Sequence, residues 1–278
     1  MFFGPRGVEV RLFRHSGRGR QGLCREIRTR VLLECDFSDT TGAAGRQCVE
    51  IIEPPGTNPP SIRTMNRHAI LFDLDGTLVD HTSASHAALR AWSPTIGIEP
   101  DFQRWLELDK WGFGRFERGE TTHLGQRRDR IRAYTGREMD DDTCDEIYTG
   151  YLRAYEQHWT AFDDALPCLE RALATGDPVG ILTNGSEEMQ QDKLNRTGLN
   201  LPGVVMLAAT TLDSAKPRPE MYERALDRLG ATTATIVGDD WVNDVEKPRE
   251  LGWKAWYINR PGTDPRVDVT SLDQVVFA

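Results

Sequence analysis

The 278-residue chain lacks the features that mark several protein classes. Its five cysteines are irregularly spaced and form no CxxC pair, which argues against a disulfide framework or a cysteine zinc site. No apolar run is long enough to cross a bilayer, and the first residues lack the apolar core of a signal peptide. We therefore expect reduced thiols in a cytoplasmic protein.

A surplus of basic residues is also missing, since the formal net charge is −9. Residues 1–64 carry ten Arg and no Lys against seven acidic residues, whereas the rest of the chain carries 24 basic and 36 acidic residues. This balance argues against a nucleic-acid partner, which usually needs a basic face. A small anionic substrate remains compatible, because a local cation can outweigh the overall charge.

Residues 1–64 differ in composition from the rest of the chain. Arg, Gly and turn-forming residues dominate, and the segment closes with a proline-rich linker at residues 53–60. Either this extension is disordered, or the true start is Met65 and the upstream residues are an error of gene prediction. Short strand-like runs such as Val8–Phe13 leave room for ordered structure.

From residue 68 onward, short apolar runs alternate with helical segments. Such alternation predicts an α/β fold with a doubly wound parallel sheet of the Rossmann type. The predicted strands are His68–Phe72, Val179–Leu182, Val204–Ala208, Thr235–Val237 and Lys254–Ile258. The predicted helices are Ala165–Ala174, Glu187–Thr197 (capped by Ser186 and closed by Gly198), Glu220–Leu229 (with Pro219 in its first turn) and Val245–Leu251.

The long gap after the first strand has a different pattern. Residues 83–163 contain no convincing strand but much helical spacing, for example at Ser85–Trp92, Leu124–Tyr134 and Asp142–Trp159. We predict an inserted helical cap domain at 83–163. The α/β core then comprises residues 65–82 and 164–278.

The most informative motif is the run from Phe72 to Thr77, Phe-Asp-Leu-Asp-Gly-Thr. Asp73 and Asp75 are two residues apart at the end of a strand, so their side chains point to the same side. Two crowded carboxylates need neutralisation, and a hard cation such as Mg²⁺ provides it. One carboxylate can attack phosphorus while the other transfers a proton, which predicts hydrolysis of phosphate esters.

Three further motifs follow later strands. The hydroxyl of Thr183 and the backbone around Asn184 are suited to phosphate oxygens at a helix start. Lys216 precedes a proline-stiffened turn that can aim its ammonium group at the strand ends. Asp239 would complete a set of oxygen ligands for Mg²⁺, and Asp244 could hold the lysine or a metal-bound water. Because ligands of such sheets bind at the carboxyl ends of the strands, we expect these groups to meet there.

This ordered set resembles the haloacid dehalogenase superfamily of hydrolases, over about residues 68–260. The resemblance implies that Asp73 is a nucleophile that forms an aspartyl-phosphate and that Asp75 protonates the leaving oxygen and then activates water. It also implies that Thr183 and Lys216 bind the phosphoryl group.

By the same resemblance, Mg²⁺ is held by the carboxylates of Asp73 and Asp239 and by the backbone carbonyl of Asp75. The dehalogenases of that superfamily typically lack the second aspartate, so Asp75 favours phosphate over halide. Two features depart from the family pattern: Asp240 replaces a small hydroxyl residue, and Lys247-Pro248 stands in a segment that usually contains glycine. We expect both to affect metal affinity rather than the core chemistry.

Substrate choice is expected to lie with the helical cap and the loop after the first strand. The candidates are His81, Trp111, Phe113 and Arg115, where glycines among aromatic residues allow motion and present flat apolar surfaces. The competing interpretation is that the tryptophan packs within the cap.

The sequence therefore predicts a Mg²⁺-dependent phosphatase for a small metabolite such as a nucleotide or sugar phosphate. The alternatives on the same core are a phosphomutase and a phosphonate hydrolase, the latter disfavoured because Lys110 is the only lysine in the cap. A non-catalytic binding protein that retains the fold is a further alternative. Either a monomer or a homodimer is compatible with the sequence.

Overall fold

The computed structural model describes residues 67–277 and, as backbone only, residues 10–12, 33–38 and 44–51. The chain divides into two compact units, Met1–Met65 and Asn66–Ala278. In the first unit the strands β1 (Val10–Leu12), β2 (Leu33–Ser38) and β3 (Ala44–Ile51) form an antiparallel sheet in the order β1-β3-β2. The other residues of the predicted extension at 1–64 lie outside those described.

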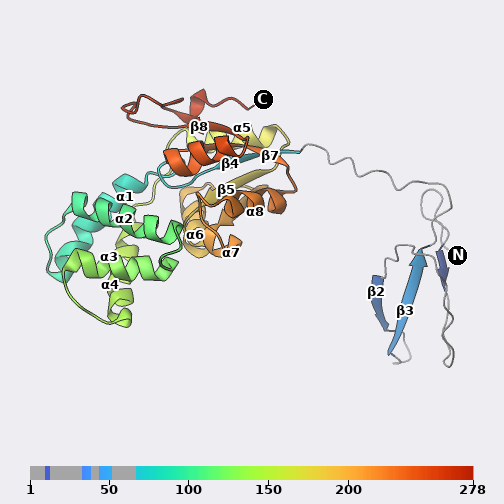
Figure 1. Cartoon of the computed structure of the whole chain (residues 1–278), viewed down its shortest axis with the longest axis horizontal. Helices are drawn as coiled ribbons and strands as arrows, with labels where there is room; N and C mark the ends of the chain where they lie inside the picture. Colours follow the sequence, from blue (N-terminus) through green and yellow to red (C-terminus); the bar gives the residue numbers. More distant parts are fainter. Residues whose placement is uncertain (1–9, 13–32, 39–43, 52–66, 278) are drawn as a thin grey trace. The chain divides into compact units, whose positions relative to one another are not determined.

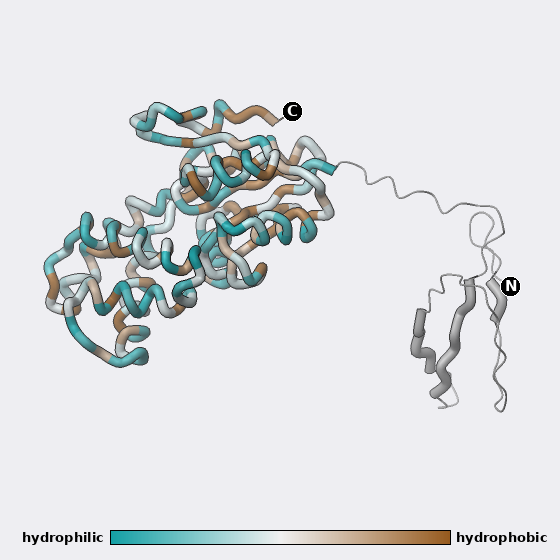
Figure 2. The backbone as a smooth tube through the Cα atoms, in the orientation of Figure 1, coloured by the Kyte–Doolittle hydropathy of each residue, from teal (hydrophilic) through white to brown (hydrophobic). Residues whose placement is uncertain are grey.

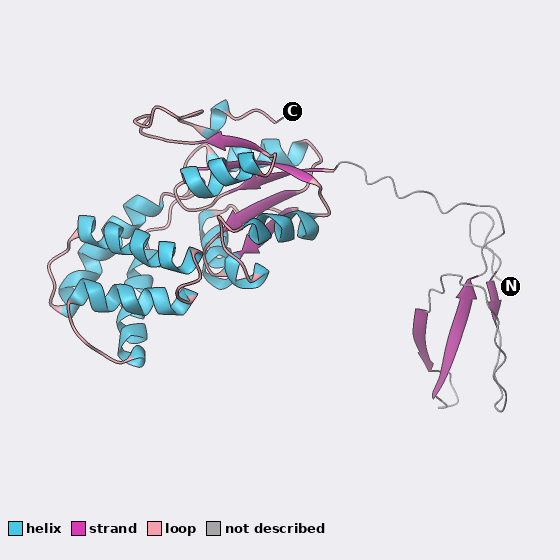
Figure 3. Ribbon diagram, viewed as in Figure 1, coloured by secondary structure: helices cyan, strands magenta, loops and turns pink. Residues whose placement is uncertain are grey.

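The second unit is built on a five-stranded parallel sheet in the order β6-β5-β4-β7-β8 (Figure 3). In the register, Phe72 of the central strand pairs with Ile181 on one side and Val237 on the other, so three strands end almost level. This arrangement confirms the predicted doubly wound sheet. The strands are β4 (His68–Phe72), β5 (Val179–Thr183), β6 (Val204–Ala208), β7 (Thr233–Gly238) and β8 (Lys254–Tyr257).

Both faces of the sheet are covered, and β4 alternates between them. Ile70 and Phe72 pack toward α5, whereas Ala69 and Leu71 pack toward α8. The apolar strands lie between more polar helices in Figure 2. The core helices are α5 (Ala165–Ala174), α6 (Glu187–Thr197), α7 (Ala209–Leu212), α8 (Pro219–Leu229), the π-helix η2 (Trp241–Glu246), α9 (Lys247–Glu250) and the short 3₁₀ turn η3 (Leu272–Gln274).

Helix α6 has the predicted limits Glu187–Thr197, but its predicted side-chain cap is absent, and the helix predicted at Val245–Leu251 differs from the structure. Ser186 stands before α6 but its side chain makes no capping bond; instead the Glu187 N–H donates to the Thr210 hydroxyl at 3.0 Å. The single helix predicted at Val245–Leu251 is two elements, η2 and α9. The first begins earlier because the Asp240 carboxylate accepts a hydrogen bond from the Asn243 N–H at 2.8 Å.

Between β4 and α5 lies a group of four helices, which we call the helical insertion (Figure 1). Each helix is preceded by a residue whose side chain accepts a hydrogen bond from a backbone N–H group of the first turn. These capping residues are Asp80, Asp101, Thr122 and Asp140. Their shared core is aromatic, and none of the described helices is long and apolar enough to span a bilayer. The insertion contains α1 (His81–Trp92), the 3₁₀ turn η1 (Ser93–Ile96), α2 (Phe102–Glu117), α3 (His123–Thr135) and α4 (Asp141–Glu156).

Helix α2 was not among the predicted helices, because Gly112 and Gly114 interrupt its pattern. A Cβ on Gly112 would lie 3.1 Å from the side-chain oxygen of Gln126 on α3. The glycine therefore lets α2 and α3 approach closely. The segment from Trp111 to Phe116 lies within α2.

Candidate active site

The candidate site forms where β4, β5 and β7 end. Asp73 directly follows β4, Thr183 is the last residue of β5, and Asp239 directly follows β7. The Asp73 N–H donates to the Val237 carbonyl at 2.9 Å, which continues the pairing of β4 with β7 by one residue. The parallel register thus brings together side chains that are far apart in the sequence.

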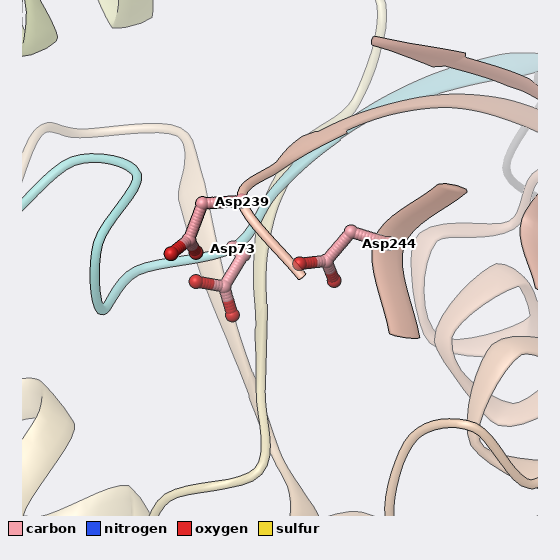
Figure 4. A group of neighbouring side chains, drawn as sticks. All are labelled: Asp73, Asp239 and Asp244. Atoms are coloured by element: carbon pink, nitrogen blue, oxygen red, sulfur yellow. The ribbon is translucent and has the colours of Figure 1, made fainter. Parts of the chain in front are cut away.

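Asp73, Asp239, Asp244 and Lys216 make up what we call the strand-end cluster. The three carboxylates each offer an oxygen within 4.8 Å of the others, and all three point into one space in Figure 4. The Lys216 ammonium donates to Asp73 at 2.8 Å and to Asp244 at 2.7 Å. Burial opposes the lysine's charge, but these two carboxylates hold the pKa of Lys216 well above its usual value.

Asp239 has no basic partner among the described residues; its carboxylate accepts one hydrogen bond, from the Thr77 hydroxyl at 3.2 Å. Its side chain is open to solvent on one side but otherwise surrounded by protein. Burial and the negative charges of Asp73 and Asp244 raise the pKa of Asp239 well above its usual value. Three carboxylates beside one ammonium group leave two negative charges uncompensated, and such a crowded set of hard oxygen donors fits a divalent cation of the Mg²⁺ type.

Two glycines leave room for these carboxylates. Gly76 has a positive φ of 92°, and a Cβ there would lie 2.2 Å from an oxygen of Asp239. A Cβ on Gly238 would lie 2.3 Å from the carboxyl carbon of Asp244. Neither position can accept a side chain without moving the carboxylate beside it.

Two of the three residues predicted to bind phosphate, Thr183 and Asn184, differ in the partners of their side chains. The Thr183 hydroxyl oxygen accepts from the Gly185 N–H at 3.1 Å and from the Gln190 amide at 2.7 Å, which leaves its own hydrogen to donate. The Asn184 amide instead bonds the backbone N–H and carbonyl of Lys216, at 2.7 and 2.9 Å. Its side chain therefore joins two loops of the site.

Asp75 does not turn toward the strand-end cluster. One carboxylate oxygen accepts from the Lys193 ammonium and the other from the Gln190 amide at 2.7 Å. Burial alone would raise its pKa, but the charge of Lys193 and the hydrogen bonds from Lys193 and Gln190 lower the pKa of Asp75 to about 2. We call Asp75, Gln190, Lys193 and Tyr155 the α6 cluster; the sequence analysis identified only its aspartate.

Of the four predicted specificity residues, His81 alone contacts a catalytic candidate within the described part of the chain. Its Nδ1 lies 4.0 Å from an Asp75 oxygen and 2.6 Å from the Tyr155 hydroxyl. Burial lowers the pKa of His81, which favours the neutral ring.

The other three make their described contacts inside the insertion. Trp111 is 44% exposed, and the Arg115 guanidinium lies over its ring. Arg115 also pairs with Asp129, and Phe113 packs edge-on against His123.

A residue that the sequence analysis missed joins the insertion to the core. The Glu117 carboxylate, at the end of α2, accepts from the amides of Asn184 and Asn243 at 2.9 and 3.0 Å. Arg218 donates to the backbone carbonyls of Glu117 and Phe116 at 2.7 and 3.0 Å. Burial raises the pKa of Glu117. No motif pointed to Glu117, because it ends a helix that was itself not predicted.

Comparison with known proteins places this site in a wider group. The family model of haloacid dehalogenase-like hydrolases matches residues 68–252. Phosphoglycolate phosphatase of Neisseria meningitidis is 29% identical over 190 residues, which cover 66% of this chain and 77% of that protein. (S)-2-haloacid dehalogenase 4A of Burkholderia cepacia is 27% identical over 217 residues, covering 75% and 90%.

A solved structure shows the same fold. The HAD-hydrolase YfnB of Bacillus subtilis, crystallised with magnesium, covers 75% of this chain and 96% of its own, with a TM-score of 0.65 and 22% identity. The family match contains the whole helical insertion and every member of both clusters. The chain therefore belongs to the haloacid dehalogenase-like hydrolases.

Proposed function

We propose that this hydrolase is a Mg²⁺-dependent phosphatase that acts on a small phosphorylated metabolite, such as a nucleotide or sugar phosphate. One observation carries the proposal: the two aspartates of the first motif have different partners. Asp73 lies among the carboxylates and the lysine of the strand-end cluster, while Asp75 is held by Gln190 and Lys193. A nucleophile and a separate proton carrier are what a two-step displacement at phosphorus requires.

In the first step a carboxylate oxygen of Asp73 attacks phosphorus and the bond from phosphorus to the ester oxygen breaks. The leaving oxygen takes a proton from Asp75. In the second step Asp75 takes a proton from water, and the resulting hydroxide attacks phosphorus and releases Asp73. With its low pKa, Asp75 is ionised in the free enzyme, as the second step needs; a bound phosphate dianion nearby raises that pKa and favours the proton needed first.

The phosphoryl group is bound by donors at the ends of β4 and β5. The free hydrogen of the Thr183 hydroxyl and the Lys216 ammonium are the side-chain donors, and the backbone N–H of Asn184 is assigned the third contact because its side chain is engaged elsewhere. Asp73, Asp239 and the backbone carbonyl of Asp75, with Asp244 beside them, would hold Mg²⁺, which would supply positive charge to the phosphoryl oxygens.

One of the relatives named above is a phosphatase and the other a dehalogenase, and the presence of Asp75 favours phosphatase chemistry for this chain. A dehalogenase releases halide and needs no proton on its leaving group, whereas an alkoxide needs one. The two hydrogen bonds that hold the Asp75 carboxylate therefore favour ester hydrolysis. The buried free thiols of Cys144 and Cys168 suit the cytosol, and neither nucleic acid nor membrane is part of the proposal. A monomer or a homodimer would serve equally.

The test is phosphate release from nucleotides, sugar phosphates, phosphoglycolate and 4-nitrophenyl phosphate, with halide release from a 2-haloacid measured alongside. Each reaction is run with Mg²⁺, with a chelator, with Asp73→Asn and with the exposed control Asp163→Asn. We expect Mg²⁺-dependent phosphate release that Asp73→Asn lowers by more than about 10³-fold. Phosphate release that survives Asp73→Asn, or halide release alone, would refute the proposal.

A further inference from the structure

We propose that Lys193 positions Asp75 for proton transfer, and that Tyr155 of the helical insertion holds Lys193 in place. The inference rests on the proposed phosphatase function, and it assigns a role to a lysine outside the motifs described above. It comes from the contacts of one buried side chain.

Lys193 is fully buried on α6, with 0% of its side chain exposed. A buried ammonium group is costly unless it is paired. Its Nζ donates to one oxygen of Asp75 and to the Tyr155 hydroxyl at 3.3 Å. It also lies 5.2 Å from the centre of the Tyr155 ring and 5.4 Å from that of Trp159. Asp75 of the core, together with Tyr155 and Trp159, thus fixes the position of this ammonium group.

Gln190 completes the arrangement from the same helix face. It precedes Lys193 by three residues, so the two side chains project side by side. Its amide donates to the other oxygen of Asp75 and to the Thr183 hydroxyl, both at 2.7 Å. Each oxygen of the Asp75 carboxylate therefore has its own donor on α6, which fixes the plane of the carboxylate relative to a phosphate-binding hydroxyl.

Lys193 acts through Asp75 and not on the phosphoryl group. The described partners of its ammonium are Asp75, Tyr155 and Trp159, whereas the ammonium beside the nucleophile belongs to Lys216. During turnover the proton passes from Asp75 to the leaving oxygen and returns to Asp75 from water. Lys193 gains and loses no proton in this cycle, so its role is one of positioning.

Tyr155 ties this arrangement to the insertion. It lies in α4, and its hydroxyl contacts both Lys193 and, at 2.6 Å, His81 at the start of α1. A displacement of α4 from α6 would remove a partner of Lys193 and so release Asp75. The geometry points to a coupling between the placement of the insertion and the orientation of the proton carrier.

The first experiment measures kcat and KM for 4-nitrophenyl phosphate with saturating Mg²⁺ in the full chain. We expect Lys193→Met to lower kcat about 10²-fold and to change KM less than about threefold. Lys193→Arg, which keeps the charge, should recover most of the loss. The matched control is Arg196→Met on the same helix, which removes a cation that lies over Trp159 and pairs with Asp192 and Glu156. That control should stay within about twofold of wild type.

A double-mutant cycle then separates positioning from general damage. In an Asp75→Asn background, Lys193→Met should cost less than about twofold more, because its target is already gone. Excess enzyme makes a single turnover visible in the weak variants. Losses that multiply in the double variant, or a KM change as large as the kcat change, would overturn the inference.

If Lys193→Met does not fold, milder substitutions take its place. Thermal melts identify this outcome, and Gln190→Met and Tyr155→Phe then take the place of Lys193→Met in the same cycle, with expected kcat losses of about tenfold and about fivefold. Additive losses for both would again overturn the inference. A wild type that releases phosphate from no substrate of the panel would instead refute the proposed function, so the two failures are distinguishable.

Discussion

Asp73 and Asp75 are two residues apart in the chain, yet the clusters that hold them are built in different ways. In the strand-end cluster, Asp73 meets Lys216, Asp239 and Asp244, which all follow strands of one sheet. In the α6 cluster, Asp75 meets side chains from the face of a helix and from the insertion. Each aspartate has a buried lysine of its own.

The difference shows what each kind of scaffold controls. Strand ends are fixed by the backbone hydrogen bonds of the sheet, and all members of the strand-end cluster come from the core. The α6 cluster depends in addition on Tyr155, a residue of the insertion. We therefore expect metal and charge to govern the first cluster, and the insertion to govern the second.

The largest effect should come from the metal, which concerns the strand-end cluster only. Chelation should lower phosphate release by more than about 10³-fold, because charge on the phosphoryl oxygens is then met by Lys216 alone. Asp239→Asn should need about 10²-fold more Mg²⁺ for half-maximal activity, whereas Lys193→Met should need no more than wild type. A Mg²⁺ titration of the three proteins decides this, and a shift in Lys193→Met would break the comparison.

The second effect concerns stability. Asp75 is the only described carboxylate within ion-pair distance of the fully buried Lys193, so Asp75→Asn leaves that ammonium group without a countercharge and should lower the free energy of unfolding by about 3 kcal/mol. Asp244→Asn leaves Lys216 paired with Asp73, so it should cost less than about 1 kcal/mol. Urea unfolding measures both, with Asp163→Asn as the surface control. A loss in Asp244→Asn as large as that in Asp75→Asn would contradict this difference.

The third effect is a pH dependence of the insertion. Burial and the charge of Arg127 lower the pKa of His123 from 6.5 to about 4. A lowered histidine pKa gives stability that is complete above about pH 6.5 and is lost as the pH falls toward 4, by about 2 kcal/mol. His123→Gln should lose less stability than wild type between pH 7 and 4, and the exposed control His158→Gln should behave as wild type. Parallel unfolding curves for wild type and His123→Gln would contradict the assignment.

The smallest effect should come from the bonds that join the insertion to the core. Glu117→Ala removes the acceptor shared by Asn184 and Asn243, and we expect kcat/KM to fall about fivefold, mainly through KM. Glu120→Ala is the matched control, because Glu120 pairs with Arg118 at the surface nearby. An unchanged KM would mean that substrate binding does not depend on this contact.

The strand-end cluster was open to prediction because Asp73 and Asp239 directly follow apolar strands, and Lys216 and Asp244 stand in motifs that come after such strands. The limits of β4 and β6 agree with the predicted strands, whereas the register of the strands came from the structure. The geometry brings Asp73, Lys216 and Asp239 together as the motifs indicated. Their chemical roles remain proposals that the experiments above test.

The α6 cluster was beyond the sequence analysis for a physical reason. Lys193 lies in a helix rich in charged residues, where a lysine normally faces solvent, and its burial involves tertiary contacts with Asp75, Tyr155 and Trp159. Helix α2 was missed because two glycines obscured its pattern, although Asp101 and the Arg104 N–H form the cap that marks its start. Contacts between the insertion and the core cannot be predicted from the spacing of apolar residues along either segment.

Gly76 and Gly238 extend the comparison to a design constraint. Each glycine lies where a single methyl group would occupy the volume of a neighbouring carboxylate, that of Asp239 or of Asp244. An alanine at either position would therefore displace the neighbouring carboxylate, although every residue of the motifs except the glycine itself would be unchanged. An enzyme of this kind can be silenced by adding one carbon atom to a residue that performs no chemistry.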